Sequence, residues 1–403
     1  MSEWKTYRLG DIIQLKSGGT PDKSNPDYWG GSIPWISAKS MYDDFISTSD
    51  LFITEEGLQA GSKIAKKDSI LLLTRGSGLF NRIPVCYVVS DVAYNQDVKN
   101  IVLKQENVTS IKFLYYWLYG NKELLSSMLE TTGIGAGKID TKRFLNLSIS
   151  LPSQKEQARY IHLMDLLFDK IELNRRINAN LEAQAQALFR SWFVDFEPFR
   201  DGPFVDSQLG KIPQGWKVEA LSNLATVIKK GITPSNAETY SHYSIPAYDD
   251  AHFPEKQSGE TIKSGKYIVY NNSILLSKLN PRIKRLWFIK TAEENAICST
   301  EFIPIQTKDT DLISFVYYLI DNDIFYQHAL SLVNGATGSH QRFHAEDIMQ
   351  IPFAWNKDAA IDFAQKANYI LQKIEDNIRE NQTLSALRDT LLPKLMAGEI
   401  NIE

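Results

Sequence analysis

Two stretches of the chain, at 153–198 and 356–398, contain almost no glycine or proline and space their apolar residues three and four positions apart. This spacing predicts one long amphipathic helix in each stretch. A helix of about 40 residues is ~60 Å long, because each residue adds ~1.5 Å. That length exceeds what the core of one domain requires, so we expect the two helices to act as spacers.

Asparagines interrupt the apolar stripe of both predicted helices at matching places. An asparagine at a buried position of a helix pair lowers stability but fixes the register and the partner. We therefore expect the two helices to pair with each other, antiparallel, as a coiled coil. The residues expected at this pairing are Phe168, Ile171, Asn174, Asn178, Leu181, Leu188, Leu371, Ile374, Asn377, Asn381, Leu384 and Leu391.

The segments before the two helices have a different pattern, with short apolar runs between clusters of Gly, Pro, Asn and Ser. Such runs predict strands and turns. The predicted strands cover residues 69–73, 85–89, 100–103, 273–276 and 302–305, and the predicted short helices cover 111–118 and 312–319. Each segment is therefore expected to fold as a compact mixed α/β domain.

The two halves of the chain repeat each other in order. The matching pairs include Trp4-Lys5 with Trp216-Lys217, Gly18-Gly19-Thr20-Pro21 with Gly231-Ile232-Thr233-Pro234, Ser69-Ile70-Leu71-Leu72 with Ser273-Ile274-Leu275-Leu276, and Leu151-Pro152 with Ile351-Pro352. Colinear pairs over the whole length indicate a duplicated domain. The expected architecture is a mixed α/β fold with two similar globular domains, separated by two long antiparallel helices and related by an internal pseudo-two-fold repeat. Its expected parts are domain 1 at 1–152, a central helix at 153–198, a linker at 199–211, domain 2 at 212–352 and a C-terminal helix at 353–403.

The charge of the chain limits its chemistry. At 403 residues it can hold two or three domains. Its net charge of −4 argues against a free-standing DNA binder, because binding to phosphates requires a basic surface. DNA binding is then expected only where cations gather locally or where a partner supplies them.

The loops of both domains do gather side chains suited to DNA. Arg can bond guanine at two atoms and Asn or Gln can do so with adenine, while Lys, Ser and Thr suit phosphates. In the first domain the candidates are Lys16, Ser17, Thr20, Lys23, Asn25, Lys39, Arg75, Ser77, Asn81, Arg82, Asn95, Gln96 and Lys138. In the second they are Lys229, Lys230, Thr233, Lys278, Asn280, Arg282, Lys284, Arg285, Ser339, His340, Gln341 and Arg342. For any single residue a solvated loop is the simpler interpretation, but the run from Lys278 to Arg285 has no acidic residue and is the strongest candidate.

Metal and nucleotide sites have little support. Cys86 and Cys298 have no CxxC spacing, and His340 with His344 lacks a further ligand, so neither a disulfide framework nor a metal site is expected. The glycine-rich stretch Gly133–Lys138 lacks both the leading glycine and the final Ser or Thr of a nucleotide-binding loop. A tight turn, or a loop whose backbone approaches a phosphate, is expected there.

Two enzyme interpretations were weighed against DNA recognition. Asn25-Pro26-Asp27-Tyr28 is one residue away from the motif that positions a flipped adenine in DNA methyltransferases, yet no glycine-rich cofactor site precedes it. A magnesium-dependent nuclease could use Asp27, Asp97 and Lys99, but the second half has no counterpart. The N-terminus lacks a signal-peptide pattern and no apolar run could span a bilayer, so a cytoplasmic location is expected.

A series of short motifs follows a fixed order along the chain. They are Leu9-Gly10-Asp11, Gly18-Gly19-Thr20-Pro21, Ile33-Pro34-Trp35-Ile36, Leu188-Phe189 with Trp192-Phe193, Ile212-Pro213 with Gly215-Trp216, and Leu387-Arg388-Asp389 with Leu392-Pro393-Lys394-Leu395-Met396. In this order they resemble the specificity subunit of a Type I restriction-modification system. One departure is Asn356-Lys357-Asp358, which stands where the first half has Gln154–Gln157, so the second helix is expected to begin differently.

The resemblance implies a subunit that is not itself an enzyme. Its two target-recognition domains would read a bipartite, asymmetric site on double-stranded DNA through the major groove. Its helices would set the spacing of the half-sites and dock two methyltransferase subunits, to which restriction and translocase subunits can join. S-adenosylmethionine, ATP and Mg would belong to those partners. The open alternatives are a coiled-coil scaffold that does not read DNA and, as the weaker one, an adenine methyltransferase.

Overall fold

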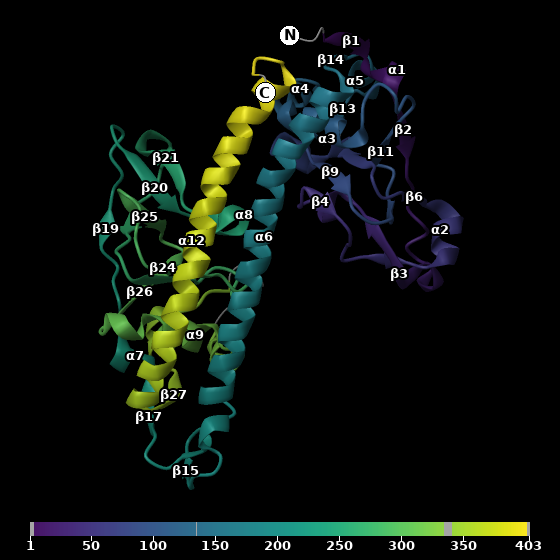
Figure 1. The fold of residues 1–403 in the computed structure, drawn as a ribbon. Helices are drawn as coiled ribbons and strands as arrows, with labels where there is room; N and C mark the ends of the chain where they lie inside the picture. The colour runs from purple at the N-terminus through teal and green to yellow at the C-terminus, as the bar shows by residue number, and fades with distance from the viewer. Residues whose placement is uncertain (1–3, 134, 334–340, 401–403) are drawn as a thin grey trace. The chain divides into compact units, whose positions relative to one another are not determined.

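The computed structural model describes residues 4–133, 135–333 and 341–400. The chain divides into two compact units: unit 1 comprises Met1–Asp169 and Leu384–Glu403, and unit 2 comprises Lys170–Thr383. Helix α6 (Gln154–Phe193) begins in unit 1 and ends in unit 2, and helix α12 (Lys357–Met396) does the reverse (Figure 1). Each unit therefore combines its own strands with part of both long helices.

The strands of unit 1 form four sheets. The five-stranded sheet has the order β2 (Ile13–Ser17), β11 (Val98–Leu103), β7 (Ile70–Leu73), β9 (Val85–Val88), β4 (Phe45–Ile46). The four-stranded sheet has the order β5 (Phe52–Ile53), β3 (Trp29–Ile36), β10 (Val92–Tyr94), β6 (Lys63–Ala65). The three-stranded sheet has the order β12 (Leu129–Thr131), β13 (Gly137–Ile139), β8 (Arg75–Gly76), and the two-stranded sheet pairs β1 (Lys5–Arg8) with β14 (Ser148–Leu151). β7 is buried at every position, which explains why its sequence is a continuous apolar run.

Within the described part of unit 2, the strands also form four sheets. The four-stranded sheet has the order β18 (Ala225–Val227), β26 (Phe302–Thr307), β23 (Ser273–Ser277), β24 (Leu286–Ile289). The five-stranded sheet has the order β19 (Gly231–Ile232), β22 (Lys266–Ile268), β25 (Ala296–Ser299), β20 (Thr239–Tyr243), β21 (Glu255–Ser258). One two-stranded sheet pairs β17 (Lys217–Ala220) with β27 (Pro352–Trp355), and the other is the hairpin of β15 (Phe204–Ser207) and β16 (Gly210–Pro213). β23 is the buried counterpart of β7.

The two units repeat each other in strand order. The antiparallel series β2-β11-β7-β9 corresponds to β18-β26-β23-β24. A parallel pair occurs once in each second sheet, as β3 with β10 and as β20 with β25. The pair β1 with β14 corresponds to β17 with β27. The predicted mixed α/β fold with an internal repeat is confirmed.

Short helices complete both units. Those of unit 1 are α1 (Leu9–Ile12), α2 (Glu55–Gly61), α3 (Ile111–Gly120), α4 (Lys122–Ser126) and α5 (Thr141–Leu145), and those of unit 2 are α7 (Leu221–Leu224), α8 (Ile245–Ala251), α9 (Ile313–Asp321), α10 (Asp323–Ser331) and α11 (Ala345–Met349). Ser110 begins α3 by accepting a hydrogen bond from the backbone N–H of Phe113. Helices α3 and α9 are buried almost all round and supply the aromatic core of their units.

The two long helices begin with different caps, as expected from the sequence. Ser153 and Glu156 form a reciprocal cap before α6, since each side chain accepts a hydrogen bond from the other's backbone N–H. Before α12, the side chain of Asn356 accepts one from the N–H of Ala359 at 3.0 Å. Among the described residues, no helix combines the length and the apolar character that crossing a membrane requires.

Candidate nucleic-acid interface

Strand pairing in unit 1 brings together several of the predicted DNA-contact residues. Arg75 of β8 lies opposite Lys138 of β13, and Ser17 of β2 lies opposite Lys99 of β11. The Nζ atom of Lys99 donates to Ser17 Oγ at 2.5 Å and to the backbone carbonyl of Gln96 at 2.8 Å. We name this group of Ser17, Arg75, Gln96, Lys99 and Lys138 the basic edge of unit 1.

The cations of the basic edge have no counter-ion in contact. Among the residues that the structure describes, none of Arg75, Lys99 and Lys138 forms an ion pair. Partial burial lowers the pKa of Lys99, Asp97 nearby opposes this, and Arg75 adds to the lowering. A phosphate bound here would relieve the repulsion between these cations.

Unit 2 has the same backbone arrangement at the equivalent place. In unit 1 the N–H of Thr74 donates to the carbonyl of Asp97 at 2.9 Å, and in unit 2 the N–H of Lys278 donates to that of Glu301 at 2.9 Å. Likewise, the N–H of Ile139 donates to the carbonyl of Thr74 at 2.9 Å, and the N–H of Phe343 donates to that of Lys278 at 3.2 Å. The bridge between Leu279 and Arg342 likewise matches the pairing of Arg75 with Lys138. Arg342 therefore occupies the place of Lys138, and Glu301 that of Asp97.

The side chains at this place differ between the units. Arg342 makes a two-point ion pair with Glu301, with Nε to Oε2 at 3.1 Å and Nη2 to Oε1 at 3.2 Å. The apolar Leu279 stands where unit 1 has Arg75, and the strand register places the buried Ile303 where unit 1 has Lys99. The edge of unit 2 thus has its cation neutralised, unlike the basic edge of unit 1.

The run from Lys278 to Arg285 contains two cations that pair with acids of unit 2, while its other cations form no ion pair among the described residues. Arg285, whose side chain is 10% exposed, forms a two-point pair with Asp249 at 2.6 and 2.8 Å. Lys284 bonds the carboxylate and the backbone carbonyl of Asp321 at 2.8 and 2.6 Å. Both residues stabilise unit 2. Asn280 has a φ of +49° and forms a turn with the N–H of Ile283.

Some of the remaining candidates are bonded to other residues of the fold, and others are exposed. DNA contact by each of them stays a prediction. Asn25 caps the short helix Pro26–Tyr28, Asn95 is buried with its side chain accepting two backbone N–H groups, and Arg82 donates to the carbonyl of Tyr42. Thr20 bonds the Gln96 side chain at 2.7 Å, Gln341 is half-buried, and Lys229 lies 3.9 Å from Glu346. The exposed candidates are Lys16, Lys23, Lys39, Ser77, Asn81, Lys230, Thr233 and Arg282, while Lys278 is half-buried. Ser339 and His340 lie outside the described residues, as do Ile134 and the glycine-rich segment 335–338.

The sequence analysis did not assign Lys99 or Glu301 to the candidate site. Lys99 was considered only for a nuclease centre, and the predicted strand began one residue after it. Val98 and Asn100, its two neighbours in β11, are both buried, so alternation along this strand was the signal that could have exposed it. Glu301 follows β25 and only its long-range pairing with Arg342 gives it significance.

In unit 2, the two long helices are joined by two pairs of asparagines. Asn174 donates to Asn381 at 2.9 Å, and Asn377 donates to Asn178 at 2.7 Å. Their remaining amide groups reach backbone carbonyls across the pair, Asn178 to Ile374 and Asn381 to Ile171. Partner numbers fall along α12 as they rise along α6, so the helices are antiparallel here (Figure 1). Leu188, Leu371 and Ile374 pack in the same core, and Leu181 is half-buried.

In unit 1, the helix pair is largely apolar. Phe168 of α6 belongs to the same core as Leu384 and Leu391 of α12. Arg388 of α12 lies 5.0 Å from the ring centre of Phe168. The asparagines of unit 2 have no equivalent in this part of the pair, as far as the described residues show.

Comparison with known proteins shows which proteins this chain resembles. Residues 1–183 match the model of the Type I restriction modification DNA specificity domain. The MjaIX specificity subunit of a Type I restriction enzyme from Methanocaldococcus jannaschii is 27% identical, over all of this chain and 94% of that relative. The HindI specificity subunit from Haemophilus influenzae is 24% identical, over 99% of this chain and all of that relative. Over its whole length the chain is therefore similar to the family of Type I specificity subunits.

The fold agrees with that family. The crystal structure of the Type I restriction-modification S subunit from M. genitalium aligns with a TM-score of 0.57 and 15% identity, over 98% of this chain and 96% of that one. These relatives are named specificity subunits, and the expectation that this chain is not an enzyme stays a prediction. Among its described residues, no group of three or more His, Cys, Asp or Glu side chains could hold a metal ion.

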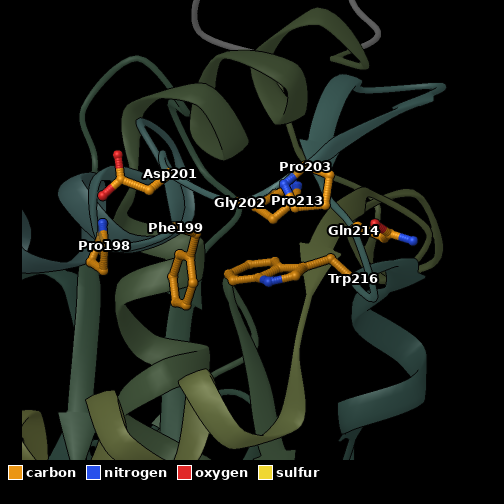
Figure 2. Close-up of a pocket in the computed structure, with 8 residues that line it drawn as sticks. All are labelled: Pro198, Phe199, Asp201, Gly202, Pro203, Pro213, Gln214 and Trp216. Atoms are coloured by element: carbon orange, nitrogen blue, oxygen red, sulfur yellow. The ribbon is translucent and has the colours of Figure 1, made fainter.

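A cavity of about 280 Å³ lies in unit 2, in the segment that connects α6 to β17. Figure 2 shows the indole of Trp216 facing Phe199, with Pro203 and Pro213 beside them; the two rings are 5.0 Å apart. None of the predicted DNA-contact residues lines this cavity. The residues suited to DNA therefore lie at the strand edges and not in this cavity.

Proposed function

We propose that this chain reads a bipartite, asymmetric DNA target, with one half-site recognised by each of its two similar domains. The observation that carries the proposal is the equivalence of two strand edges, one with Arg75 and Lys138 and the other with Arg342, in two copies of one fold. Two related but different edges suit two different half-sites. We assign the recognition domains to residues 1–152 and 212–352.

Each domain would enter the major groove from its strand edge. At the basic edge of unit 1, Arg75 is exposed and could bond guanine at two atoms, and Gln96 could do so with adenine. Lys99, Lys138 and Ser17 suit the flanking phosphates. In the second domain, Lys278 and Arg282 are the cations of the Lys278–Arg285 run that no ion pair occupies among the described residues.

The long helices would set the distance between the half-sites. Each has 40 residues and the asparagine pairs fix their register. We assign residues 153–198 and 353–403 to the spacer and 199–211 to the linker. The helices would also dock two methyltransferase subunits, and the exposed apolar side chains of Leu166 and Tyr369, 55% and 84% exposed, suit such contacts. Restriction and translocase subunits would join this complex in the cytoplasm.

The decisive experiment is genome-wide methylation mapping in a host with and without this chain. The expected result is methylation at a split sequence motif that disappears when the chain is deleted. Exchanging residues 212–352 for those of another family member should change one half of the motif and leave the other half unchanged. A complex without any sequence preference would favour a scaffold that does not read DNA, and a change in both halves would contradict independent reading.

A spacer variant tests the second part of the proposal. Insertion of four residues into each long helix adds ~6 Å, while one base pair adds ~3.4 Å. The expected result is a larger number of unread base pairs between unchanged half-sites in the same methylation map. An unchanged gap would show that the helices do not set it.

A further inference from the structure

We propose that Glu301 restrains Arg342 and thereby lowers the affinity of the second domain for DNA that lacks the target. The inference rests on the proposed function and concerns how much of the affinity for DNA each of the two edges supplies. Glu301 and Arg342 are held together at two points, at 3.1 and 3.2 Å. A phosphate can bind Arg342 only if this pair opens or is shared.

The pair is accessible to DNA. The side chain of Arg342 is 44% exposed and that of Glu301 is 28% exposed. An ion pair this exposed is weak, so a well-placed phosphate can replace the carboxylate. The carboxylate then remains beside the phosphate and repels it, because Glu301 is held by its own strand end: its backbone carbonyl accepts from Lys278 and its N–H donates to Ser299.

The first domain lacks this restraint. Asp97 occupies the equivalent place, yet no ion pair joins it to Arg75, Lys99 or Lys138 among the described residues. The basic edge of unit 1 therefore presents its cations to DNA before any base is read. We infer that the first domain supplies most of the salt-dependent, sequence-independent affinity, and that the second domain contacts the backbone firmly only when base contacts hold it in place.

The test uses the full chain in complex with its methyltransferase subunits and a fluorescein-labelled 40-base-pair duplex without the target. Binding is measured between 50 and 300 mM salt for the wild type and for Glu301→Gln. Glu301→Gln is expected to bind roughly threefold to tenfold more tightly at the lowest salt. The slope of log K against log salt is expected to steepen by about 0.9, the value for one added phosphate contact.

Two further variants separate a released arginine from a general gain of positive charge. Asp97→Asn makes the same chemical change at the equivalent place in unit 1 but releases no paired cation, so its effect is expected to be less than half as large. In the double variant Glu301→Gln with Arg342→Met, the gain should disappear. Thermal unfolding of each complex checks that the fold is kept.

The outcomes distinguish this inference from the proposed function. If Glu301→Gln binds the non-target duplex no more tightly than the wild type, or if the gain survives in the double variant, the restraint is wrong. If the wild-type complex shows no preference between the non-target duplex and a duplex with the methylated motif, the proposed function is wrong. A target preference that falls in Glu301→Gln while the motif stays the same supports both.

Discussion

Unit 1 and unit 2 attach the equivalent helices α3 and α9 to the long helices with different side chains. In unit 1, Arg388 of α12 lies 5.0 Å from the ring centres of both Tyr119 and Phe168 and 3.9 Å from Asp44. Lys122 lies 3.2 Å from the Tyr119 ring centre, and burial lowers the pKa of this lysine to about 8. Asp165 of α6 also pairs with Lys112 of α3 at 2.9 Å, so both charges contribute to this attachment.

In unit 2, an acid takes the place of the Tyr119 ring in the corresponding attachment. Glu182 of α6 accepts a hydrogen bond from Tyr318 at 3.2 Å, and Asp321 accepts one from Gln186 of α6 at 2.7 Å. Lys284 is paired with Asp321. Asp321 follows Tyr318 on α9 where Tyr119 follows Tyr116 on α3, so the same helix position carries an acid in one unit and an aromatic ring in the other. A duplicated fold can therefore keep its strand order while the chemistry of its attachments diverges.

The largest expected effect concerns the attachment of unit 1. Arg388→Ala removes the guanidinium from between two rings and leaves Asp44 with one fewer cation, so the free energy of unfolding of unit 1 should fall by about 3 kcal/mol. Hydrogen exchange of the β7 amides measures this locally. The control Arg176→Ala removes an arginine that is 76% exposed, from a pair within α6, and should change stability by less than about 0.5 kcal/mol. Equal effects of the two variants would show that Arg388 contributes no more to the stability of unit 1 than an exposed arginine does.

The next effect separates the polar helix pair of unit 2 from the apolar one of unit 1. Asn174→Leu removes the hydrogen bonds that Asn174 donates to the half-buried Asn381 and to Glu380, so it should destabilise unit 2 by about 2 kcal/mol. The double variant Asn174→Leu with Asn381→Leu should recover most of this loss, because no amide is left unpaired. Denaturant titration of the four proteins gives the coupling, and additive losses would contradict it.

Much of the fold could be predicted because it depends on local pattern. The absence of glycine and proline and the spacing of apolar residues predicted both long helices to within a few residues at the start of each. The end of α6 was placed too late: the helix ends at Phe193, and Phe196 has a φ of +51°. The start of β11 was predicted at residue 100 because Lys99 interrupts the apolar run. The strand begins at Val98 instead, and both neighbours of Lys99 are buried in it.

The candidate site could be predicted less well because pairing is not local. Nothing in the run from Lys278 to Arg285 reveals that Arg285 binds Asp249, which is distant in sequence. The repeat predicted two equivalent domains, but the equivalence of Arg342 with Lys138 comes from the backbone contacts of the structure. What alignment cannot supply is the state of each cation, which depends on the acid that the fold brings beside it.

A smaller effect uses the acids of unit 2. Burial raises the pKa of Glu182 to about 7, and Asp321 adds to the rise while Tyr318 and Lys284 oppose it. The unfolded chain loses this proton near its ordinary pKa, so stability falls as the pH rises from about 4.5 to 7 and stays low above 7. Glu182→Gln should stabilise unit 2 by about 1 kcal/mol at pH 8 and by almost nothing at pH 4. Thermal unfolding across this range measures it, and a gain independent of pH would point to packing instead of charge.

The smallest expected effect returns to the basic edge of unit 1. Lys99→Met keeps the length of the side chain but removes the cation that no ion pair occupies, so binding to a non-target duplex should weaken roughly threefold and the salt slope should fall by about 0.9. Lys66→Met is the matched control, because Lys66 is exposed and already paired with Asp91 at 2.7 Å. If both variants weaken binding alike, net charge governs the affinity. If only Lys99→Met does, the absence of an ion pair is what makes a cation of this fold available to DNA.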